Sequence, residues 1–221
     1  MKKYMGIVII SFLLNNSGRA QVPVSKEPRH HNIFENGHVR ILDVHIPPGD
    51  TSQVHIHSTP SVFVILNDVK TGSQVISEED HSNSPVPDYG NIWFEGFYKK
   101  PRIHRVWNSD TSEFHVMDIE LLNKNYVTID PPIQQESFTF LFDEKPLRAY
   151  RLNLRSAAKI SVMASKADIL MILLTDSVES IYVNEKPFHK KGNYQYIPSG
   201  TSFEIKNAAM GKAEFAFFEL K

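Results

Sequence analysis

The sequence contains no cysteine among its 221 residues. This absence excludes disulfide bonds, thiolate metal ligands and cysteine nucleophiles, so core packing must hold the fold. A phosphate-binding glycine-rich loop, a serine-nucleophile motif and a zinc-protease helix are absent too. Positive charge is not in excess either, because the formal net charge is −1. This balance argues against nucleic acid or an anionic membrane as the main partner.

The longest apolar run lies near the N-terminus and is too short for an ordinary membrane span. Lys2 and Lys3 precede this run, MGIVIISFLL, and the small residues Gly18 and Ala20 follow it. A basic start, a short apolar stretch and small residues in this order are typical of a cleaved signal peptide. We therefore expect residues 1–20 to be removed and the remaining chain to be periplasmic or secreted. No cysteine follows the run, which excludes a lipid anchor there.

The rest of the chain repeats itself. Residues 34–66 align without a gap on residues 142–174, and the matched positions include Phe34 with Phe142, Arg40 with Arg148 and Leu66 with Leu174. A second, shorter offset follows, which matches His104 with Phe203, Asn108 with Asn207 and Glu120 with Glu219. The difference places an insertion in the first copy, around residues 77–89. Two copies of one unit therefore explain the length of the chain.

Both copies have the pattern of β-strands. Leu42, Val44 and Ile46 alternate with polar residues, and short apolar runs occupy residues 61–66 and 169–174. Thirteen prolines and ten glycines, many of them at turns between these runs, favour an all-β protein. We expect an N-terminal barrel over residues 21–125, a linker over 126–136 and a C-terminal barrel over 137–221.

Three histidines stand out in the first copy. His55 and His57 form a His-x-His in VHIHS, and His104 begins HRVWN. Residues at i and i+2 of a strand point to the same face, so the first two side chains project together. Neutral imidazoles are ligands for divalent transition metals, namely Fe(II), Mn, Ni, Cu or Zn.

These residues resemble the two motifs of the cupin superfamily, and the duplicated chain resembles a bicupin. Cupin motifs are a Gly followed by His-x-His and a Glu, and then Pro-x-Gly followed by His-x-x-x-Asn. Gly49 with His55 and His57 fits the first motif, and His104 with Asn108 fits the end of the second. The resemblance implies two tandem antiparallel jelly-roll barrels. It also places the three histidines inside the first barrel as metal ligands.

Each copy departs from the cupin pattern. The motif Glu falls on residues 60–62, which have no good ligand, so a three-histidine site or a fourth ligand such as Glu95 or His115 stays open. In the second copy the three histidines align with Met163, Ser165 and Phe203. We therefore expect that the second barrel binds no metal and has a structural role, packing on the first barrel or forming an oligomer contact.

Several other polar residues are assigned by their position alone. We expect exposed side chains at His30, His31, His38, His45, His81 and His189. We expect Arg102 and Arg105 to lie on the strand face opposite His104. The side chains that both copies share are expected to be structural, the asparagines in turns and the glutamates in ion pairs.

Two functions are compatible with these patterns. The first is an exported bicupin with a metal site in the N-terminal barrel, acting as a non-haem dioxygenase or a metal-dependent isomerase or lyase. Without a carboxylate ligand the ion keeps its full charge, which favours a small, oxygen-rich anionic substrate. The alternative is a non-enzymatic module that binds a small ligand or a protein in a metal-free pocket. No general base can be named, and a homo-oligomer through barrel packing stays open.

Overall fold

The computed structural model describes residues 21–76, 83–84, 89–177 and 181–221. In these ranges the chain consists of β-strands, turns and one 3-10 helix, η1 (Val24–Lys26), with no α-helix. No helix of the described part is long and apolar enough to cross a membrane. The predicted signal peptide, His81 and most of the insertion predicted at 77–89 lie outside the described residues.

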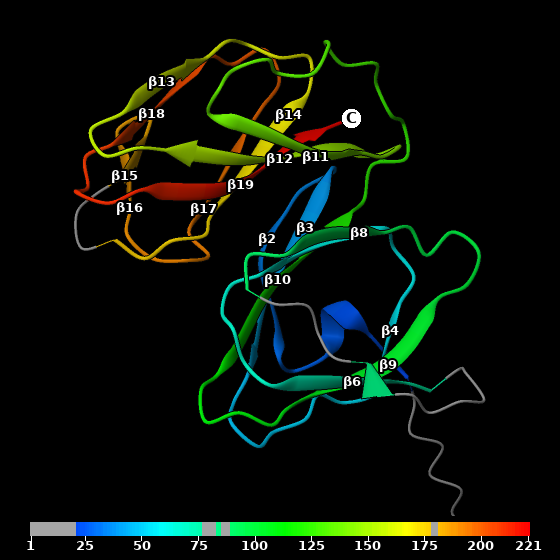
Figure 1. Ribbon diagram of the computed structural model, residues 1–221. Coiled ribbons are helices and arrows are strands. Elements are labelled where there is room, and N and C mark those ends of the chain that lie inside the picture. The colour runs from blue at the N-terminus through cyan, green and yellow to red at the C-terminus, as the bar shows by residue number, and fades with distance from the viewer. Residues whose placement is uncertain (1–20, 77–82, 85–88, 178–180) are drawn as a thin grey trace, which may run out of the picture.

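The first half of the chain forms two five-stranded sheets that enclose one barrel (Figure 1). One sheet has the order β1 (Val22–Pro23), β4 (His55–His57), β9 (Arg102–Asn108), β6 (Thr71–Val75) and β7 (Asn83–Ser84). The other has the order β2 (His30–Glu35), β3 (Val39–Ile46), β10 (Phe114–Leu121), β5 (Ser61–Ile65) and β8 (Ile92–Glu95). Except for the short parallel pair β1–β4, neighbouring strands are antiparallel.

The second half repeats this arrangement in a second barrel. Its five-stranded sheet has the order β11 (Phe138–Asp143), β12 (Leu147–Leu154), β19 (Ala213–Leu220), β14 (Asp168–Leu173) and β17 (Tyr194–Ile197). Its four-stranded sheet has the order β13 (Lys159–Val162), β18 (Phe203–Asn207), β15 (Ile181–Val183) and β16 (Lys186–Phe188). The prediction of an all-β chain with two antiparallel jelly-roll barrels is confirmed.

Strand alternation divides the apolar residues between three cores. On β3, Leu42, Val44 and Ile46 face the interior of the first barrel, whereas Val39 and Ile41 face outward and are equally buried. The interior of the second barrel is filled by a larger cluster that includes six aromatic rings, those of Phe138, Tyr150, Phe188, Phe203, Phe215 and Phe217. The second barrel therefore has apolar side chains at the place where the first barrel keeps polar ones.

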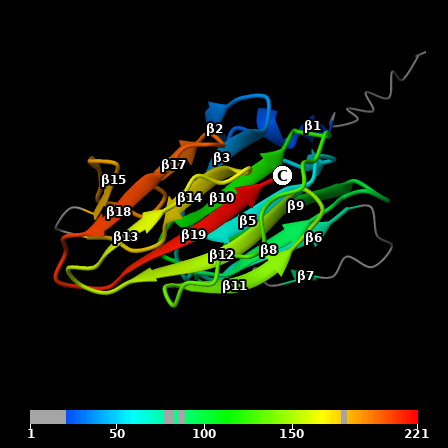
Figure 2. The same ribbon diagram turned by 90° about the horizontal axis from the view of Figure 1, so that it is seen from above.

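The third core joins the two barrels. Outward-facing residues of β3, β5 and β10 form one buried cluster with residues of β12, β14 and β19. In Figure 2 the strands β10 and β5 of the first barrel run beside β14 and β19 of the second. Both outer sheet faces are apolar and would be exposed in separate barrels, so burying them against each other is favourable. The expected packing of the second barrel on the first is therefore observed; its structural role stays a prediction.

The asparagines that both copies share hold the same kind of turn. Asn108 Nδ2 donates to the backbone oxygens of Ile46 and Ser112 at 2.9 and 2.7 Å. Asn207 Nδ2 donates to Leu154 O and Gly211 O at 3.2 and 2.8 Å. Both side chains are buried. The predicted structural role of this position is confirmed.

Replacing Asn207 by alanine is expected to lower the free energy of unfolding by about 2–3 kcal/mol. The change leaves buried backbone carbonyls and the Ala209 N–H without a partner, and unpaired buried polar groups are costly. Urea unfolding measures this loss, with Lys206→Ala on the exposed face of the same strand as the control. A loss below about 0.5 kcal/mol, as for ordinary surface changes, would contradict the role.

The shared glutamates form ion pairs inside their own barrels. Glu120 Oε2 lies 2.5 Å from Arg40 Nη1, and Glu219 Oε2 lies 3.0 Å from Arg148 Nη1. The two pairs occupy matching positions of β10 with β3 and of β19 with β12. The predicted structural ion pairs are therefore present in both copies.

Candidate metal centre

Strand pairing brings the three predicted histidines together. His55 lies directly opposite His104 in the antiparallel pair of β4 and β9, and His57 follows on the same face of β4. The ring centroids of His55, His57 and His104 lie 4.6 to 5.0 Å apart. All three side chains are buried in the first barrel.

A fourth histidine joins them from the facing sheet. His30, on β2, has its ring centroid 4.7 Å from that of His55. The ligand atoms of His30, His55 and His57 all lie within 4.8 Å of one another. The expectation that His30 is exposed was wrong, because β1 pairs with β4 and brings the following residues into the barrel. Strand alternation around residue 30 gave no signal for this position.

Glu27 contacts the ring of His30 directly and is linked to the ring of His55 through the backbone of Gln53. Its Oε2 lies 2.6 Å from His30 Nδ1, and its Oε1 accepts a hydrogen bond of 3.0 Å from the backbone N–H of Gln53. The carbonyl of Gln53 accepts one of 2.8 Å from His55 Nδ1. A carboxylate or carbonyl on one ring nitrogen fixes the tautomer and leaves the other nitrogen free to bind a metal. For His30 and His55 that other nitrogen is Nε2.

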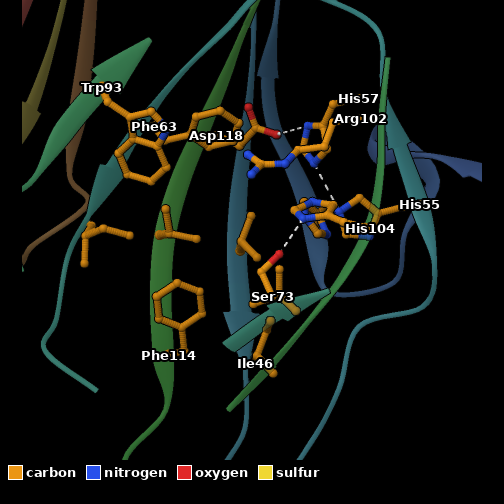
Figure 3. Close-up of a pocket in the computed structure, with 15 residues that line it drawn as sticks. Ile46, His55, His57, Phe63, Ser73, Trp93, Arg102, His104, Phe114 and Asp118 are labelled. Atoms are coloured by element: carbon orange, nitrogen blue, oxygen red, sulfur yellow. Dashed lines mark hydrogen bonds and ion pairs between the residues drawn. The ribbon is translucent and has the colours of Figure 1, made fainter. Parts of the chain in front are cut away.

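The remaining two histidines have polar neighbours on other strands. Ser73 Oγ hydrogen-bonds to His104 Nδ1 at 2.9 Å, and Asp118 Oδ2 lies 3.5 Å from His57 Nδ1. Figure 3 shows both contacts, with Asp118 and Ser73 on opposite sides of the histidine group. His30, His55 and His104 therefore have a hydrogen-bonded outer partner at Nδ1, whereas His57 Nδ1 has only Asp118 nearby and makes no hydrogen bond within the described residues.

The inward nitrogens of His55 and His57 have a spacing that fits a metal ion, whereas His104 does not belong to the set of ligand atoms within 4.8 Å of one another. His55 Nε2 and His57 Nε2 lie 3.1 Å apart, close to the spacing of two ligands on an ion at about 2.0–2.1 Å. His104 Nε2 is buried without a hydrogen-bond partner in the described part of the chain. Buried polar nitrogens without partners are costly, so a cation among them would satisfy groups that the protein leaves open. The donor set suits Zn, Fe(II), Ni or Cu.

The histidines are kept in the neutral form that binds metal. Burial, together with the charge of His30, lowers the pKa of His55 to about 4. Burial lowers the pKa of His57 and of His104 well below the usual range, and neighbouring histidines and Arg102 add to the effect. At neutral pH these three imidazoles are uncharged, so no proton has to leave before a metal binds.

The same pKa shift predicts acid sensitivity of the metal-free protein. Below pH 6.5 the unfolded His55 takes up a proton, whereas the folded residue stays neutral until about pH 4. Its contribution is therefore present above pH 6.5 and is lost as the pH falls toward 4, by about 3 kcal/mol. Urea unfolding of chelator-treated wild type and His55→Gln across this interval measures the difference, and parallel curves would contradict it.

A buried carboxyl that the sequence analysis missed lies beside the histidines. Asp118, on β10, is fully enclosed, and burial raises its pKa well above the usual range. Its position alternates with the outward-facing Met117 and Ile119, so strand alternation indicates that it points inward. By the shorter offset of the repeat, Asp118 corresponds to Phe217, which is part of the apolar core of the second barrel.

An apolar cavity of about 110 Å³ opens beside the histidines. This volume suits a small molecule better than a polymer. Figure 3 shows the imidazoles along one side of the cavity, with Phe63, Trp93 and Phe114 at the other. Phe63 and Trp93 stack with ring centroids 4.9 Å apart. The remaining apolar lining consists of Val44, Ile46, Ile65, Val106 and Val116.

Arg102 provides a positive charge at this cavity. The prediction that it faces away from His104 was wrong, because residues at i and i+2 of a strand share a face and Arg102 lines the cavity with His104. Its Nη1 lies 3.3 Å from Glu95 Oε1, and both side chains are partly exposed. Arg105 does lie on the other face, hydrogen-bonded to Gln74. Strand parity, applied correctly, would have found Arg102.

Neither sequence-based choice for a fourth ligand lies among the histidines. Glu95 pairs with Arg102. His115 lies on the outer face of the first barrel, where its Nε2 is 2.7 Å from Asp43 Oδ1. His30 and Asp118 occupy the positions closest to the group instead.

Within the described residues the second barrel has no counterpart of the site, although the alignment of His55 and His57 needs correction, to Val162 and Ala164. His104 pairs with His55, whereas its counterpart Phe203 pairs with Val162 and not with Met163. The connection that precedes β13 is one residue shorter, so the ungapped alignment slips there. Val162 and Phe203 are both buried and apolar. These two side chains cannot bind a metal.

The comparisons with known proteins concern structure only. No family model matches the chain, and no curated protein matches it in sequence. Salicylate 1,2-dioxygenase from Pseudoaminobacter salicylatoxidans is similar, with a TM-score of 0.61 and 11% identity over 90% of this chain and 75% of that one. AerE from Microcystis aeruginosa gives 0.58 and 11%, over 88% and 98%. YhhW from Escherichia coli gives 0.59 and 12%, over 88% and 89%.

A cupin 2 conserved barrel domain protein from Leptotrichia buccalis is similar as well, with a TM-score of 0.53 and 12% identity over 86% of this chain and 88% of that one. At such identities the likeness shows the fold. The chain therefore has the two-barrel cupin fold that its motifs predicted. One fold can carry many activities, so the function must come from the residues of the site.

Proposed function

We propose that this two-barrel cupin binds one divalent transition metal in its N-terminal barrel, through His55, His57, His104 and His30. We propose further that it is exported and that it is an enzyme, a metal-dependent dioxygenase, isomerase or lyase that acts on a small anion. The metal is Fe(II), Mn, Ni, Cu or Zn. The observation that carries the proposal is the arrangement of four buried imidazoles, three of them held at Nδ1 by a hydrogen-bonded outer partner.

The residues of the site have different roles. Glu27 and Ser73 orient His30 and His104, and such outer partners raise metal affinity. The low pKa values of His55, His57 and His104 keep these ligands neutral. A bound metal supplies Lewis acidity at this place and a coordination position for substrate. Phe63 and Trp93 exclude water from the far side of the cavity.

The lining indicates the chemical class of the substrate. A ligand that reaches the histidines meets the guanidinium of Arg102, which suits a carboxylate. Its body would lie against Phe63, Trp93 and Phe114, which suits an apolar or aromatic group. We therefore propose an organic acid with an apolar body in place of the oxygen-rich anion expected from the sequence. The similar salicylate 1,2-dioxygenase supports testing aromatic carboxylates first.

Metal loading combined with an activity assay tests this proposal. Chelator-treated protein is reloaded with Fe(II), Mn, Ni, Cu or Zn, and oxygen uptake and product formation are measured with a panel of aromatic and aliphatic carboxylates. The control is the His55→Ala/His57→Ala protein treated in the same way. Turnover that requires metal and both histidines is the expected result. Carboxylate binding without any turnover would favour the non-enzymatic binding module.

A further inference from the structure

A second group of histidines lies outside the first barrel. Asp43 and His45 on β3 and His115 on β10 each offer a ligand atom within 4.8 Å of the other two. On these strands Val44 and Val116 face the interior, so the odd-numbered residues face outward. The group therefore shares no residue with the site in the barrel.

We propose that Asp43, His45 and His115 form a second metal site that takes a zinc-class cation. The backbone sets this arrangement, because His45 and His115 are direct partners in the antiparallel pair of β3 and β10. Side chains of direct cross-strand partners lie side by side. Asp43 precedes His45 by two residues and so projects from the same face.

The distances fit a common ion. His115 Nε2 lies 2.7 Å from Asp43 Oδ1, and His45 Nε2 lies 3.1 Å from Asp43 Oδ2. Ligands at about 2.0–2.1 Å from one ion are about 3 Å apart or slightly more. The two imidazole rings stack with centroids 4.2 Å apart. Both rings have their Nε2 atom beside the same carboxylate, that of Asp43. A cation that binds there replaces the proton on each Nε2, which passes to solvent, while each ring carries a proton at Nδ1 and stays neutral. The ion then takes two nitrogens and one oxygen.

The surroundings support a site that forms before a metal arrives. Glu113 Oε2 lies 3.0 Å from His45 Nδ1, so the ring is fixed between two carboxylates with its Nε2 toward Asp43. Asp43 and Glu113 raise the pKa of His45 to about 9, so an ion that binds Nε2 displaces one proton from this ring. On the other side, a Cβ added at Gly192 would lie 3.2 Å from His115 Cε1. The second barrel therefore packs against this ring. His45, His115 and Asp43 remain 18 to 29% exposed, which leaves a route for entry.

The ligand set points to the zinc class. Two neutral imidazoles and one carboxylate are a common set for Zn²⁺, and three protein ligands leave a fourth position for water. Thiolates are absent from the chain, so a preference for Cu(I) has no basis.

The second barrel offers a built-in comparison. Asp43, His45 and His115 correspond by the repeat to Arg151, Asn153 and Glu214. There Arg151 Nη1 and Glu214 Oε2 form an ion pair of 3.4 Å. The second copy thus fills the same outer face with one cation–carboxylate pair, and the histidine group is particular to the first copy.

Titration calorimetry with Zn²⁺ on the full, chelator-treated chain tests the proposal. Wild type is expected to bind two ions per chain. Asp43→Asn/His115→Gln should bind one, His55→Ala/His57→Ala should bind one, and the combined variant none. His38→Ala is the matched control, because His38 pairs with Asp168 at 3.1 Å outside either group. Glu113→Gln should keep two ions and weaken one of them about 10–100-fold.

The variants separate this proposal from the one for the barrel. Loss of one ion in Asp43→Asn/His115→Gln, but not in His38→Ala, would support the outer site even if the barrel bound nothing. Circular dichroism checks that the variants fold. If the double variant fails to fold, the single variant His45→Gln takes its place. A folded variant with the stoichiometry and affinity of wild type would show a hydrogen-bonded His–Asp network only, and would overturn the proposal.

Discussion

The protein with His55→Ala/His57→Ala is expected to lose the metal ion of its first barrel completely. Changing an outer partner of a metal ligand typically costs about 10–100-fold in affinity, and this variant removes two ligands. The loss is best measured by elemental analysis in the background Asp43→Asn/His115→Gln, which leaves only the barrel site to count. The metal content should fall from one ion per chain to none.

Stability gives a second readout of the same loss. A ligand that binds only the folded state at 1,000 times its Kd stabilises it by about 4 kcal/mol. Adding metal should therefore raise the melting temperature of the parent, which is the Asp43→Asn/His115→Gln protein. It should leave the melting temperature unchanged when His55→Ala/His57→Ala is added to that parent. His189→Ala, at an exposed position, is the matched control. An equal rise in parent and double variant would place the metal elsewhere.

Arg102→Met is expected to weaken the binding of a small aromatic carboxylate, with benzoate as the probe, about 10-fold to 100-fold. A hydrogen bond to a charged group contributes about 1.5–3 kcal/mol, and Met keeps the apolar stem of the side chain at the cavity. Calorimetry on metal-loaded protein measures the change. Metal content should stay as in wild type, because Arg102 is not a ligand.

Two comparisons make the Arg102 result specific. Arg105→Met removes a similar charge from the opposite face of the same strand and should leave benzoate binding unchanged. Benzyl alcohol, which lacks the carboxylate, should bind wild type and Arg102→Met equally. Equal benzoate affinity in wild type and Arg102→Met would mean that the anion binds without this guanidinium.

The fold could be predicted because its signals are local and repeated. Alternation in strands such as residues 39–46, Pro and Gly at turns, and the internal offset each indicate the same architecture. The ungapped alignment was wrong at β13, where it matched His55 with Met163 in place of Val162. A connection that is one residue shorter shifts every aligned position after it until a second gap restores the offset. Strand pairing in three dimensions detects such a shift, whereas an ungapped alignment cannot.

The site could be predicted only where its residues share a strand or a motif. His55, His57 and His104 belong to motifs, and the structure brings them together; their role as metal ligands stays a prediction. His30 comes from a segment whose place depends on the pairing of β1 with β4, which has no local signal. Asp118 and Arg102 are different, since strand parity correctly applied places both on inward faces, although Arg102 was assigned to the wrong face and Asp118 was missed.

The central claim is that one metal ion lies among the histidines of the first barrel and none lies in the second. Anomalous diffraction from a crystal of metal-loaded protein, collected at the absorption edge of that metal, tests it most directly. The account predicts a peak at about 2.0–2.1 Å from the Nε2 atoms of His55, His57 and His104, and no peak beside Phe203. A first barrel without a peak, in crystals that bind the metal elsewhere, would contradict the account.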